Sequence, residues 1–181
     1  MTTMLEQIRA VVATTAPRWQ TLLATIPADL AERPPQPGEW SAVECLRHLT
    51  DAEQFLWPVR VRALLVGEDF PAFNPTADGR DYAALAPAQL AEEFARLRVA
   101  NLPLLASITE ADFARTGTHP ELGAVTLGQL LHEWAAHDLM HTVQAERALM
   151  QPFIAGTGPW RFYFADHDVA PTGASVPVTG E

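Results

Sequence analysis

Apolar residues recur at intervals of three and four positions along four stretches of the chain, which are separated by segments rich in proline, glycine and polar residues. The four stretches cover residues 5–26, 41–67, 87–108 and 126–150. This spacing places the apolar side chains on one side of an α-helix, which turns once in about 3.6 residues. The pattern therefore predicts four amphipathic helices, and the second of them should stop at Gly67.

Short polar motifs mark where two of these helices begin. Ser41 precedes Glu44 by three residues, as Thr126 precedes Gln129. In a capping box of this form, the hydroxyl accepts a hydrogen bond from the third helical amide, and the longer side chain accepts one from the amide of the cap. We expect the second and fourth helices to start here, and we expect Pro152 to mark the end of the fourth.

The predicted helices define the fold class. No strand pattern of useful length appears, and residues 118–125 are expected to form a loop. Amphipathic helices joined by loops indicate an all-α protein, with a four-helix bundle made by residues 1–150. Residues 151–181 form a C-terminal extension. Its aromatic part, residues 152–165, is expected to dock on the bundle because it is too aromatic for a solvated linker.

Composition narrows the range of partners. The chain has 181 residues, of which 48% are hydrophobic, so it can bury a sizeable core as a single domain. Its formal charge of −10 disfavours nucleic acid, which is bound through clustered lysine and arginine. The N-terminus lacks the pattern of a signal peptide and no stretch resembles a membrane span, so we expect a cytoplasmic protein with no membrane contact. The single cysteine, Cys45, excludes an internal disulfide and a multi-cysteine zinc site.

Three histidines interrupt the apolar faces of two predicted helices. His137 and His141 are four residues apart on the fourth helix, in line with Trp134 and Ala145, so both imidazoles should point toward the bundle interior. His48 holds a similar inward position on the second helix. One shared divalent ion would explain their placement, and three imidazoles would leave a position open for water or substrate. Alternatively, each is a core or surface histidine satisfied by a backbone carbonyl.

The remaining histidines provide a contrast. His132 lies on the other side of the fourth helix from the inward pair, so it is not expected to join the site. His119 falls in the expected loop and His167 falls in the tail, where solvent exposure is the expected state.

Several polar residues lie within one helical turn of the three histidines and are candidates to orient them by hydrogen bonding: Glu44, Asp51, Asp138 and Gln144. The capping box explains Glu44 equally well, and solvent exposure is the favoured interpretation of the other three. Trp40 and Trp134 are interpreted as core residues or as walls of a pocket.

The motifs around the histidines resemble those of the DinB/YfiT-like superfamily of metal-binding helix bundles. The likeness rests on EWSAVE before His48 and on TLGQLL before His137 and His141, and it extends over roughly residues 1–150. The resemblance implies that these three histidines bind one divalent ion, nickel or zinc or a similar metal. It also implies a homodimer.

The resemblance is less specific about the reaction. Related proteins include hydrolases and thiol-dependent transferases and isomerases, so the expected activity is metal-dependent hydrolysis, or transfer or isomerisation that uses a low-molecular-weight thiol. The substrate would then be a small molecule. A non-catalytic, stress-associated protein that binds a metal or a small ligand is the alternative. DNA binding, which the damage-inducible origin of the family name suggests, conflicts with the negative charge.

Overall fold

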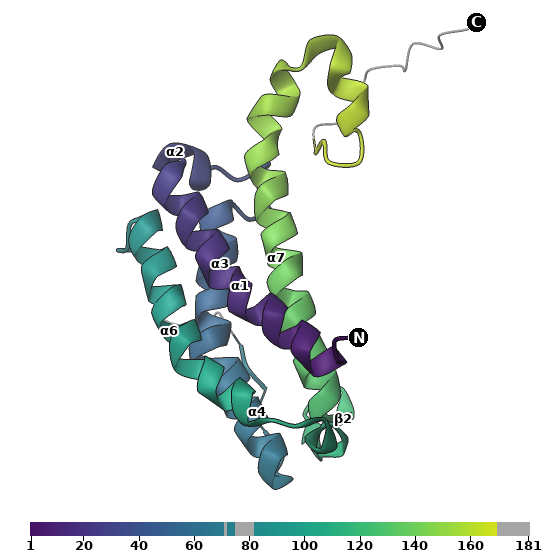
Figure 1. Ribbon diagram of the computed structural model, residues 1–181. Coiled ribbons are helices and arrows are strands. Elements are labelled where there is room, and N and C mark those ends of the chain that lie inside the picture. Colours follow the sequence, from purple (N-terminus) through teal and green to yellow (C-terminus); the bar gives the residue numbers. More distant parts are fainter. Residues whose placement is uncertain (71, 75–81, 170–181) are drawn as a thin grey trace, which may run out of the picture.

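The computed structural model describes residues 1–70, 72–74 and 82–169, and its main elements are helices. In chain order these helices are α1 (Met4–Thr25), α2 (Ala28–Ala31), α3 (Ala42–Asp51), η1 (Ala52–Leu56), α4 (Trp57–Val66), α6 (Pro87–Ser107), η2 (Glu110–Ala114), α7 (Leu127–Gly156) and η3 (Gly158–Phe164). The four long helical arms, with α3, η1 and α4 forming one of them, pack against one another as a four-helix bundle (Figure 1). The predicted all-α bundle is confirmed. None of the described helices has both the length and the apolarity to cross a membrane.

Both predicted capping boxes are present. Ser41 Oγ accepts a hydrogen bond from the amide of Glu44 at 3.2 Å, and a carboxylate oxygen of Glu44 accepts one from the amide of Ser41 at 2.7 Å. The same pair of bonds joins Thr126 and Gln129 at 3.1 and 2.8 Å. Gly67 ends α4 in the left-handed conformation with φ of 76°, where a residue without a Cβ is favoured. These signals set where α3 and α7 start, and therefore which faces carry the histidines.

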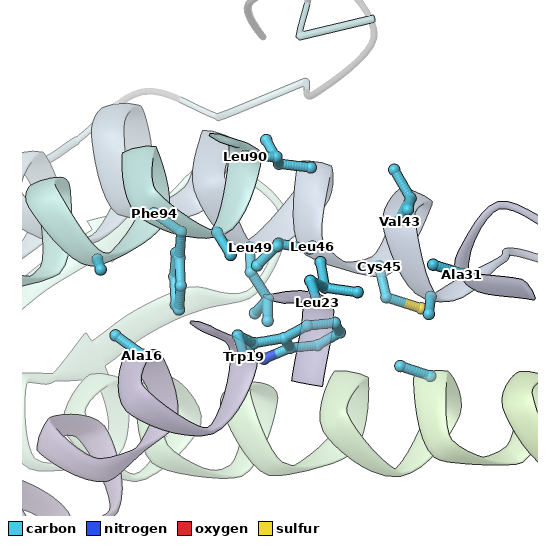
Figure 2. Packing of buried hydrophobic residues seen from close by; sticks show 14 of the residues in the cluster. Ala16, Trp19, Leu23, Ala31, Val43, Cys45, Leu46, Leu49, Leu90 and Phe94 are labelled. Carbon is cyan, nitrogen blue, oxygen red and sulfur yellow. The ribbon is translucent and has the colours of Figure 1, made fainter. Parts of the chain in front are cut away.

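The core consists of two apolar clusters stacked along the bundle. One is built on Trp19, Leu46 and Phe94, and Figure 2 shows the side chains of α1, α3 and α6 meeting in it. The other is built on Trp57 and Trp134 near the opposite end of the helices. Each cluster draws on α1, α6, α7 and one half of the α3–η1–α4 arm, so both clusters tie all four arms together.

The arm that follows His48 departs from the predicted periodicity. In a regular helix the face that carries His48 would continue through Phe55, Val59 and Ala63, but Val59 is 45% exposed. Instead, Trp57 and Val61 are buried. The cause is η1, a π-helical turn in which the amide of Trp57 bonds to the carbonyl of Ala52, five residues earlier. One extra residue in that turn shifts the phase of everything after it.

A β-hairpin replaces the loop expected at residues 118–125. Strands β1 (Thr116–His119) and β2 (Gly123–Thr126) pair antiparallel, with His119 opposite Gly123. Four residues per strand are too few for a two-residue alternation to stand out in the sequence. The hairpin leads directly into α7.

The C-terminal extension also differs from the prediction. The helix α7 continues through Pro152 to Gly156, and burial of Ile154 holds its last turn in place. Most aromatic side chains beyond it are not buried on the bundle, because Trp160, Phe162 and Tyr163 are 64%, 49% and 70% exposed. Figure 1 shows the end of α7 and η3 extending past the other helices.

Candidate metal centre

The three inward histidines converge. His48 comes from α3, and His137 and His141 come from the neighbouring helix α7. One ring nitrogen from each lies within 4.8 Å of the others, and the Nε2 atoms of His48 and His137 are 3.0 Å apart. Among the described residues, this group of metal-binding side chains consists of three imidazoles. The structure therefore brings together all three residues that the sequence singled out.

Burial keeps these imidazoles neutral. It lowers the pKa of His48 to about 4 and that of His137 to about 3, and the proximity of the other rings of the group lowers both further. The pKa of His141 is also lowered, mainly by burial. Neutral imidazole is the form that ligates a metal, because protonation removes the lone pair. At neutral pH each of the three rings therefore has one unprotonated nitrogen whose lone pair can bind a metal.

Three further observations concern the ring nitrogens and their partners. The Nδ1 atom of His141 lies 2.9 Å from the amide oxygen of Gln144, which makes Nδ1 the protonated nitrogen and leaves the lone pair on Nε2. The Nδ1 atom of His137 is buried and has no hydrogen-bond partner among the described residues. The facing Nε2 atoms of His48 and His137 have donor capacity for at most one mutual hydrogen bond if both rings are neutral. A bound cation would use both lone pairs.

Trp40 forms one wall of the histidine group. Its ring centroid is 5.2 Å from that of His48, and it stacks on His141 at 5.7 Å with an interplanar angle of 21°. Trp40 is 38% exposed, so this wall borders solvent. Of the two tryptophans considered from the sequence, this is the one that touches the histidines.

A different tryptophan covers His137. Trp57 meets its ring edge-on, with centroids 5.3 Å apart, whereas Trp134 stacks behind Trp57 at 5.5 Å and has no exposed surface. Trp134 is thus a core residue that supports the wall. Trp57 was missed because the π-helical turn before it rotates it inward from its place in a regular helix.

The acidic neighbours of the histidines have other partners. The carboxylate of Glu44 is bound by the amide and hydroxyl of Ser41, which supports the capping interpretation. Asp138 and Asp51, which solvent was expected to cover, are 0% and 7% exposed. Asp138 forms an ion pair with Arg98, which is the partner of its buried carboxylate.

Arg98 is the centre of a buried ionic network that the sequence did not indicate. Its Nη1 lies 2.6 Å from a carboxylate oxygen of Asp138, and its Nε lies 3.0 Å from one of Glu53. It also donates to the carbonyl of Val12 on α1. Asn101 donates to Glu53 through its amide nitrogen at 3.1 Å. A long basic side chain on an amphipathic helix is normally solvated, so no local signal reveals this burial.

The other histidines stand apart. His132 is outside the metal-binding group, and its Nδ1 bonds to the carbonyl of Gly128 at 2.7 Å. His167 is exposed in the tail. His119 corrects the expectation of solvent exposure, because it is only 9% exposed in β1, where its ring packs on Phe70.

Fold and site together define a four-helix bundle with a three-histidine centre between two of its arms. The chain belongs to the DinB superfamily, whose sequence pattern matches residues 12–145. Its fold is similar to that of YfiT from Bacillus subtilis, described as a probable metal-dependent hydrolase with an unusual four-helix bundle topology. The two share 16% sequence identity with a TM-score of 0.69, covering 82% of this chain and 88% of YfiT. No curated protein matches the chain.

Proposed function

We propose that this protein is a metal-dependent enzyme in which His48, His137 and His141 hold one divalent ion, nickel or zinc, with a position left for a small-molecule substrate. The observation that carries the proposal is the convergence of three neutral imidazole nitrogens within 4.8 Å. Membership of the DinB superfamily supports it. The similar fold of YfiT, a probable metal-dependent hydrolase, also supports it.

The chemistry follows from the donor set. A divalent ion held by three neutral histidines supplies Lewis acidity, which polarises a carbonyl or activates a nucleophile such as water or a thiol. Gln144 holds His141 in the correct tautomer, while Trp40 and Trp57 restrict the approach of solvent. Asp51, one turn after His48 and 7% exposed, is a candidate for a general base because of its position in the sequence.

Water and a low-molecular-weight thiol are the two nucleophiles that this chemistry serves. Hydrolysis is favoured by the likeness to YfiT, a probable metal-dependent hydrolase, and transfer or isomerisation with a thiol would use the same open position. A bundle that binds a metal or a small ligand without turnover is the alternative. A carboxylate that acts on the substrate would distinguish an enzyme from a protein that only binds a ligand. If an Asp51→Asn variant keeps both its metal and its turnover, Asp51 has no part in the mechanism.

Metal analysis tests the proposal directly. We expect one divalent ion per purified chain, and replacing His48, His137 or His141 singly with alanine should remove most of it. Adding the metal back should raise the melting temperature of the parent but not of the variants, because a ligand that binds only the native state stabilises it. His132→Ala is the matched control and should keep full metal content, because His132 lies outside the group.

Two results would contradict this assignment. Unchanged metal content in all three variants would place any ion elsewhere, and loss of metal in His132→Ala would mean that the helix faces are misassigned. Once the metal is in place, ester and thiol-adduct substrates can be screened on the parent and on His137→Ala. Turnover that persists in the metal-free variant would contradict a metal-dependent reaction.

We also propose that the chain forms a homodimer. The support is an exposed apolar face on α7, where Leu139, Met140 and Val143 are 41%, 55% and 63% exposed. Light scattering should give twice the chain mass for the parent and a single chain for Val143→Glu. A monomeric parent would contradict the proposal.

A further inference from the structure

A cavity separate from the three-histidine group lies where the β-hairpin meets α4 and the first turns of α7. Its volume is about 380 Å³, which is in the range of small-molecule sites. Apolar side chains that include Phe70, Leu130 and Val125 line it, together with four polar ones: Arg60, His119, Gln129 and Glu133. Among the described residues that line it, none belongs to the three-histidine group.

Arg60 is a buried cation that forms no ion pair with a carboxylate in the described part of the chain, although Glu133 lines the same cavity. Arg60 is 7% exposed, and its Nε is buried with no hydrogen-bond partner among the described residues. The guanidinium lies over the ring of Phe70, with Cζ 5.2 Å from the ring centroid. Burial lowers the pKa of Arg60, while Glu133 and Glu121 raise it from a distance. A guanidinium in such a place is stabilised by a planar anion that takes two of its N–H groups at once.

His119 offers a second donor beside the same ring. Its Nδ1 accepts hydrogen bonds from the amides of Glu121 and Leu122 at 3.1 and 3.3 Å. Nδ1 is therefore the unprotonated nitrogen, and Nε2 carries the ring proton. The His119 ring meets Phe70 edge-on, with centroids 5.7 Å apart. Phe70 is thus flanked by a guanidinium and by an imidazole whose N–H is available to a ligand.

The cavity is held in shape before any ligand arrives. The amide of Thr118 in β1 donates to a carboxylate oxygen of Asp69 at 2.8 Å, which ties the hairpin to the segment after α4. Gly117 fits against that segment so closely that a Cβ there would lie 2.5 Å from the carbonyl oxygen of Glu68. A preformed cavity reduces the ordering cost that a ligand must overcome.

The lining also restricts the ligand. Phe70 and Leu130, each 4% exposed, give the cavity an apolar surface. Glu133 borders it and Glu121 lies nearby, so an anion with several charges would be repelled. We propose that this cavity binds a small organic monocarboxylate, with its carboxylate on Arg60 and His119 and its apolar body against Phe70 and Leu130.

Calorimetric titration of the full-length protein with 3-phenylpropionate tests this proposal. We expect saturable binding at one site per chain, with the same affinity within about twofold after EDTA treatment and after metal is restored. The neutral analogue 3-phenylpropanamide should bind at least tenfold more weakly, because it lacks the charge that Arg60 needs. Inorganic phosphate should not compete, because it offers no apolar body and carries more charge.

Variants locate the site. Arg60→Gln should weaken binding at least tenfold, whereas Arg62→Gln should leave it within about twofold, because Arg62 is an exposed residue on the same helix. Leu122→Glu is a second variant that does not depend on altering a buried residue, since Leu122 is 73% exposed. A negative charge at this lining position should weaken binding about fivefold.

Several outcomes would overturn the proposal. They are equal binding by Arg60→Gln and the parent, equal binding of the carboxylate and the amide, effective competition by phosphate, and absence of binding. Loss of binding after EDTA treatment or in His137→Ala would place the carboxylate at the three-histidine centre instead. Because the expected result is independent of metal, failure of this proposal and failure of the proposed metal-dependent function are distinguishable.

Discussion

Among the described residues, two clusters of polar side chains lie within the apolar interior. Each contains one of two consecutive residues of α7. His137 belongs to the three-histidine group, and Asp138 belongs to the network around Arg98. In that network opposite charges face one another: Arg98 lies between the carboxylates of Glu53 and Asp138 and also binds a backbone carbonyl. The charges are therefore matched within the chain, although Oε2 of Glu53 has no hydrogen-bond partner among the described residues.

The histidine group is not matched in this way. Its rings are neutral, two Nε2 atoms face each other at 3.0 Å, and the buried Nδ1 of His137 has no hydrogen-bond partner among the described residues. Gln144 is the partner of His141 alone. A buried polar cluster whose charges are matched within the chain contributes to the fold, whereas neutral imidazoles that face one another with free lone pairs are suited to bind a cation. The difference separates a structural role from a functional one within a single helix.

The largest expected effect comes from breaking the charge-matched cluster around Arg98. Arg98→Met should lower the free energy of unfolding by about 3–5 kcal/mol, because it leaves two buried carboxylates without their cation. Urea denaturation measures the change. Arg96→Met is the matched control on the same helix. Its side chain is 62% exposed and pairs with Glu93, so the loss should be much smaller than in Arg98→Met. A small loss in Arg98→Met would contradict a structural role for the network.

The second prediction concerns the pH dependence of the metal-free protein. The pKa values of His48 and His137 are about 4 and about 3 in the fold, whereas an unfolded histidine titrates near about 6.5. Below that pH the unfolded chain binds more protons than the native one, so the free energy of unfolding should fall as pH falls toward 4.

The expected slope is about 1.4 kcal/mol per pH unit for each such histidine. Urea melts between pH 7 and pH 5 in the presence of EDTA measure it. A His48→Gln variant should lose about one histidine's share of the slope. An identical slope in parent and variant would show that His48 is not buried as a neutral ring.

The difference between the clusters also explains what could be predicted from sequence. The histidines were placed correctly because each signal is local: a capping box sets the start of the helix, and regular turns carry the phase to His48, His137 and His141. The arm beyond His48 was placed wrongly because the π-helical turn adds a residue. Nothing in the sequence around Phe55 specifies that turn, which is visible only through the burial of Trp57 and Val61 that results from it.

The Arg98 network escaped prediction for a different reason. Whether an arginine on a helix is solvated or buried depends on carboxylates that come from other helices, here Glu53 on η1 and Asp138 on α7. The exposed aromatic residues of the C-terminal extension illustrate the converse, because Trp160 and Tyr163 have the composition of a docked segment without the contacts. Composition indicates which surfaces prefer burial, but the partner that buries them is a property of the tertiary fold.

A smaller effect is expected from changing Gln144, whose side chain forms a hydrogen bond with His141. Gln144→Ala removes the acceptor of the His141 Nδ1 proton and should weaken metal binding about 10- to 100-fold. The stability of the metal-free protein should change little. Competitive chelator titration measures the affinity, and Gln144→Glu, which keeps an acceptor, should restore most of it. Equal affinity in Gln144→Ala and the parent would show that this hydrogen bond does not orient the ligand.

The smallest expected effect tests whether helix starts serve both clusters alike. Ser41→Ala and Thr126→Ala each remove the hydroxyl that caps α3 or α7, and each should lower the free energy of unfolding by about 0.5–2 kcal/mol. Thr14→Ala is the control, because Thr14 is an exposed residue in the middle of α1 and alanine is the better helix former there. Denaturant melts compare the three.

Metal content gives the capping variants their second readout. Because a cap stabilises the helix without touching a ligand, both variants should still bind one ion per chain under conditions in which they are folded. If Thr126→Ala lost its metal while remaining folded, the start of α7 would be setting the orientation of His137 and His141 directly. The histidine group would then depend on the far end of its helix, more than ten residues away, rather than on the packing of α3 against α7 that the structure shows.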